Sequence, residues 1–114
     1  MNAEQYKISL FLHLFKEFAS CSFQFVPRKK NLDSLAQLGI TIQQAKGIIM
    51  GLTYRNYYRG PLRDRMLPEE EIWEFGTDLG DMELYIKIKV NTPQKMGICL
   101  SFHRAEKDMT YPYK

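Results

Sequence analysis

The chain has 114 residues, which is the usual size of one domain with a single hydrophobic core. Hydrophobic residues make up 45% of it and charged residues 25%, a composition typical of globular proteins rather than of disordered or fibrous ones. The net charge is only +3, and no apolar run reaches the roughly 18 residues of a membrane span. We therefore expect a cytoplasmic protein without a signal peptide or a membrane segment.

Residues 2–20 predict an amphipathic helix, because apolar residues recur there at spacings of three and four positions. The stripe consists of Ile8, Phe11, Leu12, Phe15 and Phe18. Leu10 and Leu14 widen it, so we expect this helix to pack on more than one neighbour. We expect His13, within the same helix, to be a surface or partly buried histidine rather than a catalytic one.

Two shorter helices are expected next. A basic link at 27–30 precedes a helical piece at 31–38, which Gly39 can end. The following helix starts at Thr41, where Gln44, three residues later, completes a capping-box pattern.

The motifs of several enzyme classes are missing from the sequence. There is no Gly-rich phosphate loop, no His/Cys cluster and no G-x-S-x-G nucleophile motif. Cys21 and Cys99 are far apart and match no metal-ligand spacing, so we expect a reduced intracellular pair, with one disulfide as the alternative. The sequence predicts no metal site and no cofactor.

The segment 53–65 (TYRNYYRGPLRDR) contains four arginines and three tyrosines against one aspartate. Arginine binds phosphate through two parallel hydrogen bonds, and tyrosine rings can stack on unpaired bases. This basic loop therefore supplies candidate RNA-binding residues, namely Arg55, Tyr58, Arg63 and Arg65. The alternative is a solvated, arginine-rich loop without a ligand.

From residue 72 onward the pattern changes from helical to alternating. Residues 72–75 predict a short strand after a solvated acidic turn at 69–71, and 76–81 predict a loop. Residues 83–90 and 96–103 predict two longer strands of a hairpin around Pro93. One face of this hairpin is apolar: Leu84, Ile86, Ile88, Val90, Met96, Ile98, Leu100 and Phe102. The tail from Glu106 is expected to be loosely ordered.

The order of elements predicts one α+β domain, with N-terminal helices packed on one face of a small C-terminal antiparallel sheet. Its parts are a helical region (1–52), a basic loop with the first strand (53–75), a β-hairpin (82–104) and a tail (105–114). The second face of the sheet is left to solvent or to a ligand.

The hairpin register follows from pairing apolar residues with apolar residues on the buried face. Residues 84, 86, 88 and 90 then oppose 102, 100, 98 and 96. This register puts Tyr85 opposite Ser101 and diagonal to His103. Glu74 falls on the same outer face if its strand pairs with 83–90.

The outer face thus gathers groups that suit metal-free RNA cleavage: Glu74, Tyr85, Lys87, Lys89 and His103, with Arg59 from the adjoining loop. That reaction needs a base for the ribose 2′-OH, an acid for the 5′-oxygen leaving group and a cation for the phosphate. Glutamate and histidine are a natural acid–base pair, and Lys87 and Lys89 can bind RNA. The alternative is the ordinary polar side of a half-buried sheet, on which the lysines only solubilise the strand.

From Val26 to His103 the chain resembles the MqsR family of bacterial toxin ribonucleases, which share the RelE-like fold. The segments GIIMGLTYRNYYRG, EIWEFG, ELYIKIKV and CLSFHR carry the resemblance, in the order and near the spacing of that family. The resemblance implies a RelE-like, microbial-RNase-like fold. It also implies an mRNA interferase held inactive by an antitoxin protein, of helix-turn-helix type.

The functional positions of that family fall on four residues of this chain. A family lysine falls on Arg59, which keeps the cation, and a family glutamine falls on Glu74, which can act as a base. The strand tyrosine is kept as Tyr85, and a second lysine falls on His103, a better proton donor near neutral pH. The resemblance therefore implies that these four residues are catalytic.

Two other functions remain open at this point. One is a non-catalytic RNA-binding module, or a toxin relic that has lost its chemistry, in which segment 53–65 would bind the RNA. The other is a toxin of the same fold directed at gyrase, against which Glu74 and His103 argue.

Overall fold

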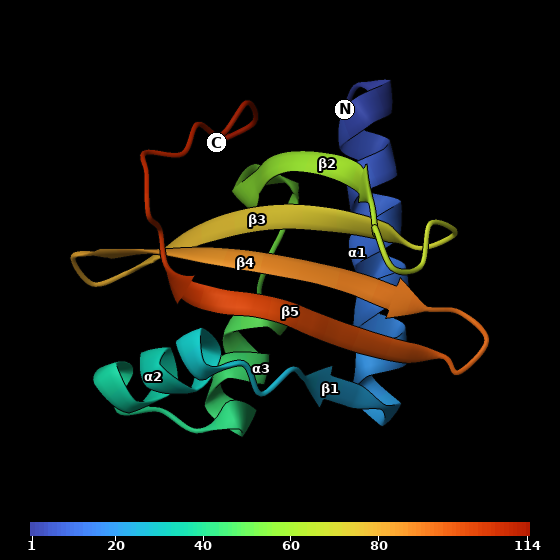
Figure 1. Cartoon of the computed structure of the whole chain (residues 1–114). Helices are drawn as coiled ribbons and strands as arrows, with labels where there is room; N and C mark the ends of the chain where they lie inside the picture. The colour runs from blue at the N-terminus through green and yellow to red at the C-terminus, as the bar shows by residue number, and fades with distance from the viewer.

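The computed structural model describes all 114 residues and confirms the predicted α+β class. A long helix crosses behind a five-stranded sheet, and two shorter helices lie beside one edge of that sheet (Figure 1). In chain order the elements are α1 (Ala3–Cys21), β1 (Phe23–Phe25), α2 (Lys29–Leu38), α3 (Ile42–Met50), a 3₁₀ turn η1 (Tyr54–Asn56), β2 (Tyr57–Arg63), β3 (Glu71–Leu79), β4 (Met82–Asn91) and β5 (Met96–Arg104). None of the helices combines the length and the apolar composition that a bilayer crossing requires.

Helix α1 begins with a capping box, in which Asn2 and Gln5 bond to each other's backbone N–H. Its buried stripe packs on the sheet, and Phe11 stacks on Trp73 of β3 with ring centroids 4.9 Å apart. Leu10 and Leu14 are 53% and 36% exposed. These two side chains are therefore largely in solvent, whereas the helix itself does pack on more than one element, namely β1, β4, β5 and η1.

The predicted boundaries of the next two helices hold closely. Helix α2 ends at Gly39, whose φ of 68° is left-handed and suits glycine. Helix α3 follows the capping box of Thr41 and Gln44, and both of its predicted reciprocal hydrogen bonds are present. The predicted basic link is shorter than expected, because Lys29 already belongs to α2.

The sheet has the order β1-β5-β4-β3-β2 and is mixed, not wholly antiparallel. Strand β1, which the sequence analysis missed, runs parallel to β5 and pairs Phe25 with Cys99. With three residues, β1 is too short to show alternation. It brings the start of α2 to the edge of β5, where the outer face of the sheet begins (Figure 1).

Segment 53–65 is not a loop. Its central part is strand β2, which pairs antiparallel with β3 and aligns Arg59 with Glu74 across two register shifts. Strand β3 continues to Leu79, so most of the loop predicted at 76–81 is also strand. Trp73 and Phe75 point into the core as expected.

The register of the β4–β5 hairpin differs from the prediction by one residue at the turn, where Asn91 pairs with Met96, and by a second residue at a β-bulge. Ser101 pairs with Lys87 and Cys99 with Ile88, so Leu100 is an extra residue in β5. Tyr85 therefore lies directly opposite His103, not opposite Ser101. Between the bulge and the turn, the two faces of β5 are exchanged relative to the prediction. Gly97 and Cys99 face the core, and Ile98 faces outward opposite Lys89. The predicted apolar alternation is therefore wrong for this part of β5.

The side-chain amide of Asn31 holds the bulge in place. Where β1 ends, its Nδ2 donates to the carbonyl oxygens of Val26 and Leu100, and its Oδ1 accepts from the backbone N–H of Phe102, at 2.9–3.0 Å. The residue is 1% exposed, so water cannot replace these bonds. The Asn31 side chain thus bonds to the backbone of β5 where a longer β1 would have done so, and it attaches the first turn of α2 to β5.

The tail is packed against the domain rather than loosely ordered. Met109 is buried, and the Tyr111 hydroxyl donates to Glu83 at 2.8 Å. The Tyr113 ring stacks on Tyr57 with centroids 6.2 Å apart. A side chain at Gly76 would collide with Met109 and Tyr111, so glycine is required there for the tail to dock.

Replacing Asn31 by leucine tests the role of its amide. The change keeps the volume but leaves the Leu100 carbonyl and the Phe102 N–H buried without partners, at roughly 1–3 kcal/mol each. We expect the free energy of unfolding to fall by about 3 kcal/mol in urea titrations. Gln43→Leu, at an exposed position of α3, is the control and should change it by less than about 0.5 kcal/mol. A normal urea midpoint for Asn31→Leu would contradict this role.

Candidate active site

A cavity of about 510 Å³ opens on the outer face of the sheet, between β2, the start of α2 and the residues after β5. It contains all four predicted catalytic residues and Lys87. The residues that line it are Arg28, Lys30, Asn31, Arg59, Glu74, Tyr85, Lys87, Ser101, His103, Ala105, Glu106, Lys107 and Met109. We call it the site cavity.

Glu74 lines the site cavity, and its side chain is only 2% exposed. Each of its carboxylate oxygens has its own partner: Oε1 accepts from Nε of Arg59, and Oε2 accepts from the hydroxyl of Tyr85. A buried carboxylate requires such compensation. Three neighbouring strands, β2, β3 and β4, each contribute one member of this group.

The buried Glu74 carboxylate also affects the protonation of Tyr85 and the position of Arg59. Burial raises the pKa of Tyr85, and the hydrogen bond to Glu74 raises it further, so the phenol stays protonated. The side chain of Arg59 is 52% exposed, and only its Nε donates to Glu74. Its two terminal nitrogens make no hydrogen bond within the protein, and they have the geometry to bind a phosphate.

His103 lies across β4 from this group. Its ring is 5.3 Å from the ring of Tyr85, centroid to centroid, and the two planes are tilted by 38°. Nδ1 lies 2.9 Å from the carbonyl oxygen of Arg104. Because a carbonyl oxygen can only accept, Nδ1 carries the hydrogen, and Nε2 is the nitrogen left to exchange a proton with a ligand.

Three further cations, which were not predicted from the sequence, line the site cavity. Arg28 and Lys30 come from the start of α2, and Lys107 comes from the residues after β5. The basic composition of 27–30 was visible in the sequence. Its position beside His103 was not, because it depends on the parallel pairing of β1 and on Asn31.

The remaining predicted RNA-binding arginines do not line the site cavity. Arg55 lies over the ring of Tyr54, Arg63 donates to the Pro68 carbonyl, and Arg65 is exposed in the β2–β3 loop. Tyr58 is beside the site, because the Arg59 guanidinium lies 5.3 Å from its ring centroid.

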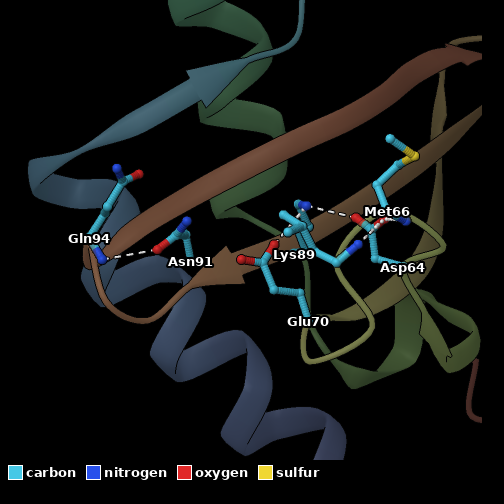
Figure 2. Close-up of polar contacts among 7 residues, drawn as sticks. Asp64, Met66, Glu70, Lys89, Asn91 and Gln94 are labelled. Carbon is cyan, nitrogen blue, oxygen red and sulfur yellow. Dashed lines mark hydrogen bonds and ion pairs between the residues drawn. The ribbon is translucent and has the colours of Figure 1, made fainter.

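Lys89 is separated from the site and is not available to RNA. Figure 2 shows its ammonium between Asp64 and Glu70, in the loop that joins β2 to β3. The Lys89 nitrogen lies 2.7 Å from a carboxylate oxygen of each residue, but its angle to the Glu70 oxygen does not suit a hydrogen bond. The three side chains are 7–13% exposed. The prediction of a solvated turn at 69–71 is thus wrong for Glu70. The prediction that Lys89 binds RNA is also wrong, because these carboxylates hold its ammonium.

The two cysteines are free: Cys21 is exposed and Cys99 is buried. Burial raises the pKa of the Cys99 thiol to about 12, so it is not a nucleophile at neutral pH. No group of three or more His, Cys, Asp and Glu side chains is arranged to hold a metal ion.

Comparisons of the chain with models of protein families, with curated proteins and with solved structures find no match. The geometry of the site and the resemblance noted in the sequence are therefore the basis for a functional proposal.

The ion-pair group around Lys89 predicts a specific pH dependence of stability. The hydrogen bond from Lys89 lowers the pKa of Asp64. The ionised carboxylate then stabilises the fold above its ordinary pKa of about 4, and this stabilisation is lost as the pH falls through the lowered pKa. We expect Lys89→Met to lower the free energy of unfolding at pH 7 by about 3 kcal/mol, because two nearly buried carboxylates lose their cation.

The same variant should show a smaller loss of stability between pH 5 and pH 3 than the unmodified protein, measured by urea titration at each pH. Lys87→Met is the matched control, because Lys87 has no ion pair and the variant should keep the original pH profile. Identical profiles for Lys89→Met and the unmodified protein would show that the ion pairs do not stabilise the loop.

Proposed function

We propose that this protein is an endoribonuclease that cleaves single-stranded RNA through attack of a ribose 2′-hydroxyl on the adjacent phosphorus, without a metal ion. The observation that carries the proposal is the meeting of Glu74, Tyr85, His103 and Arg59 in one cavity. A proton acceptor, a proton donor and a phosphate-binding cation are then all supplied by side chains. The proposed products are a 2′,3′-cyclic phosphate and a free 5′-hydroxyl.

Glu74 is too deeply buried to touch the 2′-hydroxyl directly. Tyr85 donates to it and lines the same cavity, so we assign the proton transfer to the pair. The Tyr85 oxygen takes the proton of the 2′-hydroxyl as its own proton passes to Glu74. The raised pKa of Tyr85 fits this role, because the phenol transmits a proton without becoming a stable phenolate.

His103 serves the leaving group. In its protonated form, Nδ1 donates to the Arg104 carbonyl and Nε2 donates to the departing 5′-oxygen. As the phosphorus–O2′ bond forms and the phosphorus–O5′ bond breaks, Nε2–H protonates that oxygen. Arg59 and Lys87 neutralise the negative charge that accumulates on the phosphate.

The resemblance to the MqsR family extends the proposal to a bacterial toxin restrained by an antitoxin protein. In support, each of the four segments that carry the resemblance contributes one residue to the same cavity: Arg59, Glu74, Tyr85 and His103. As such a toxin the protein would act on mRNA in the cytoplasm. Expression without the antitoxin should then arrest growth, and His103→Ala should remove the arrest.

Cleavage of a panel of single-stranded RNAs by the purified protein, with and without EDTA, tests the catalytic proposal. We expect EDTA-resistant cleavage and products with 2′,3′-cyclic phosphate ends. His103→Ala should lower kcat by roughly 10²–10⁴-fold, the usual range for loss of a general acid or base. Tyr85→Phe and Glu74→Gln should lower it comparably, because the two side chains transfer the proton together.

His13→Ala provides a matched control, because His13 is the second histidine of the chain and lies exposed on α1. It should cleave RNA at the original rate. If the unmodified protein cleaves none of the RNAs, or if His103→Ala and His13→Ala behave alike, the catalytic proposal is wrong. Binding of RNA without cleavage would favour the non-catalytic module instead.

A further inference from the structure

A second cavity, of about 650 Å³, adjoins the site cavity on the side of α2. The two share Lys30, His103, Ala105 and Glu106, so His103 lies at their junction. We call the second one the α2 cavity; it is lined by Lys29, Lys30, Asp33, Ser34, Gln37, His103, Arg104, Ala105 and Glu106. Together they form a path across the end of the sheet, from Arg59 on β2 to α2.

This path concentrates the positive charge of the molecule. It contains seven of the sixteen lysines and arginines but only three of the thirteen acidic residues. The cations are Arg28, Lys29, Lys30, Arg59, Lys87, Arg104 and Lys107, and the acids are Asp33, Glu74 and Glu106. The largest cavity, of about 930 Å³, is different: it is lined by Lys7 and Arg63 but by Glu69, Glu70 and Glu71, so its charge does not favour RNA.

An ion pair spans the junction between the two cavities. Lys30 Nζ lies 2.8 Å from a carboxylate oxygen of Glu106, and the two side chains are 57% and 67% exposed. An exposed pair of this kind contributes little to stability and exchanges partners easily. Breaking this ion pair so that Lys30 binds a phosphate would therefore cost little stability.

We propose that a single RNA strand crosses both cavities, with the scissile phosphate at His103 and a flanking phosphate in the α2 cavity. There the flanking phosphate replaces Glu106 on Lys30, with Lys29 and Arg104 beside it. This inference rests on the proposed function for the identity of the strand. The proposed subsite lies outside the catalytic group, and His103 is the one proposed catalytic residue that lines both cavities.

The test measures binding of a short, fluorescent 2′-O-methyl RNA at several salt concentrations by fluorescence anisotropy. The methyl group blocks the attacking hydroxyl, so binding is observed without cleavage. For a single strand the logarithm of affinity falls with the logarithm of salt by about 0.7 for each phosphate contact. Lys30→Met should reduce this slope by about 0.7 and weaken binding roughly fivefold at 0.1 M salt.

Two further variants make the result specific. Glu106→Gln removes the competing carboxylate and should tighten binding severalfold, an effect opposite to that of a damaged fold. Lys7→Met carries the same charge change as Lys30→Met but lies on α1, outside the path, and should bind as the unmodified protein does. Original binding by Lys30→Met, or equal losses in Lys30→Met and Lys7→Met, would overturn the subsite.

The outcomes separate this inference from the proposed function. If the protein cleaves RNA and Lys30→Met changes neither the RNA affinity nor KM, the ribonuclease proposal stands and the α2 subsite is wrong. Binding that depends on Lys30, from a protein that cleaves no RNA, keeps the subsite and removes the catalytic proposal. Absence of any RNA binding removes both.

Discussion

The outer face of the sheet depends on one buried amide. By bonding to β5 on both sides of Ser101, the Asn31 side chain holds the bulge that adds Leu100 to the strand. The bulge fixes two features together. It aligns His103 with Tyr85, and it turns Cys99 toward the core. Because Asn31 belongs to the first turn of α2, the same bonds bring the cations of that turn to the edge of the site.

Two groups of opposite charges lie on the outer face, and they differ in how much of each cation is exposed. Around Lys89 all three charged side chains are nearly buried. Their charges pair with one another and hold the β2–β3 loop on the sheet. Around Glu74 only the carboxylate is buried, and the guanidinium of Arg59 is half exposed. The difference matters for the proposed function, because a substrate can reach a cation only where part of it remains in solvent. One half of the face is closed and the other is an open, basic cavity.

The site cavity is assembled from parts that are far apart in the chain. The α2 start, four strands and the residues after β5 all contribute to its lining. The tail belongs to this assembly, since Met109 lines the cavity and packs against Gly76 of β3. The proposed acid–base chemistry requires groups held in a fixed geometry, and here that geometry depends on all of these elements. It also means that stability and site geometry depend on the same contacts.

The sequence by itself determined the helix boundaries, the alternation of β4 and the outward position of Glu74, because caps and side-chain periodicity are local properties. It also indicated Arg59, Tyr85 and His103 as partners of Glu74. Only the tertiary structure decided the parallel strand β1, the bulge in β5, the burial of Lys89 and the cations from α2. A three-residue strand has no periodicity, and the sequence of a bulge resembles that of a regular strand. Whether a lysine meets solvent or two carboxylates depends on a loop that folds over it from 19 to 25 residues away in the chain.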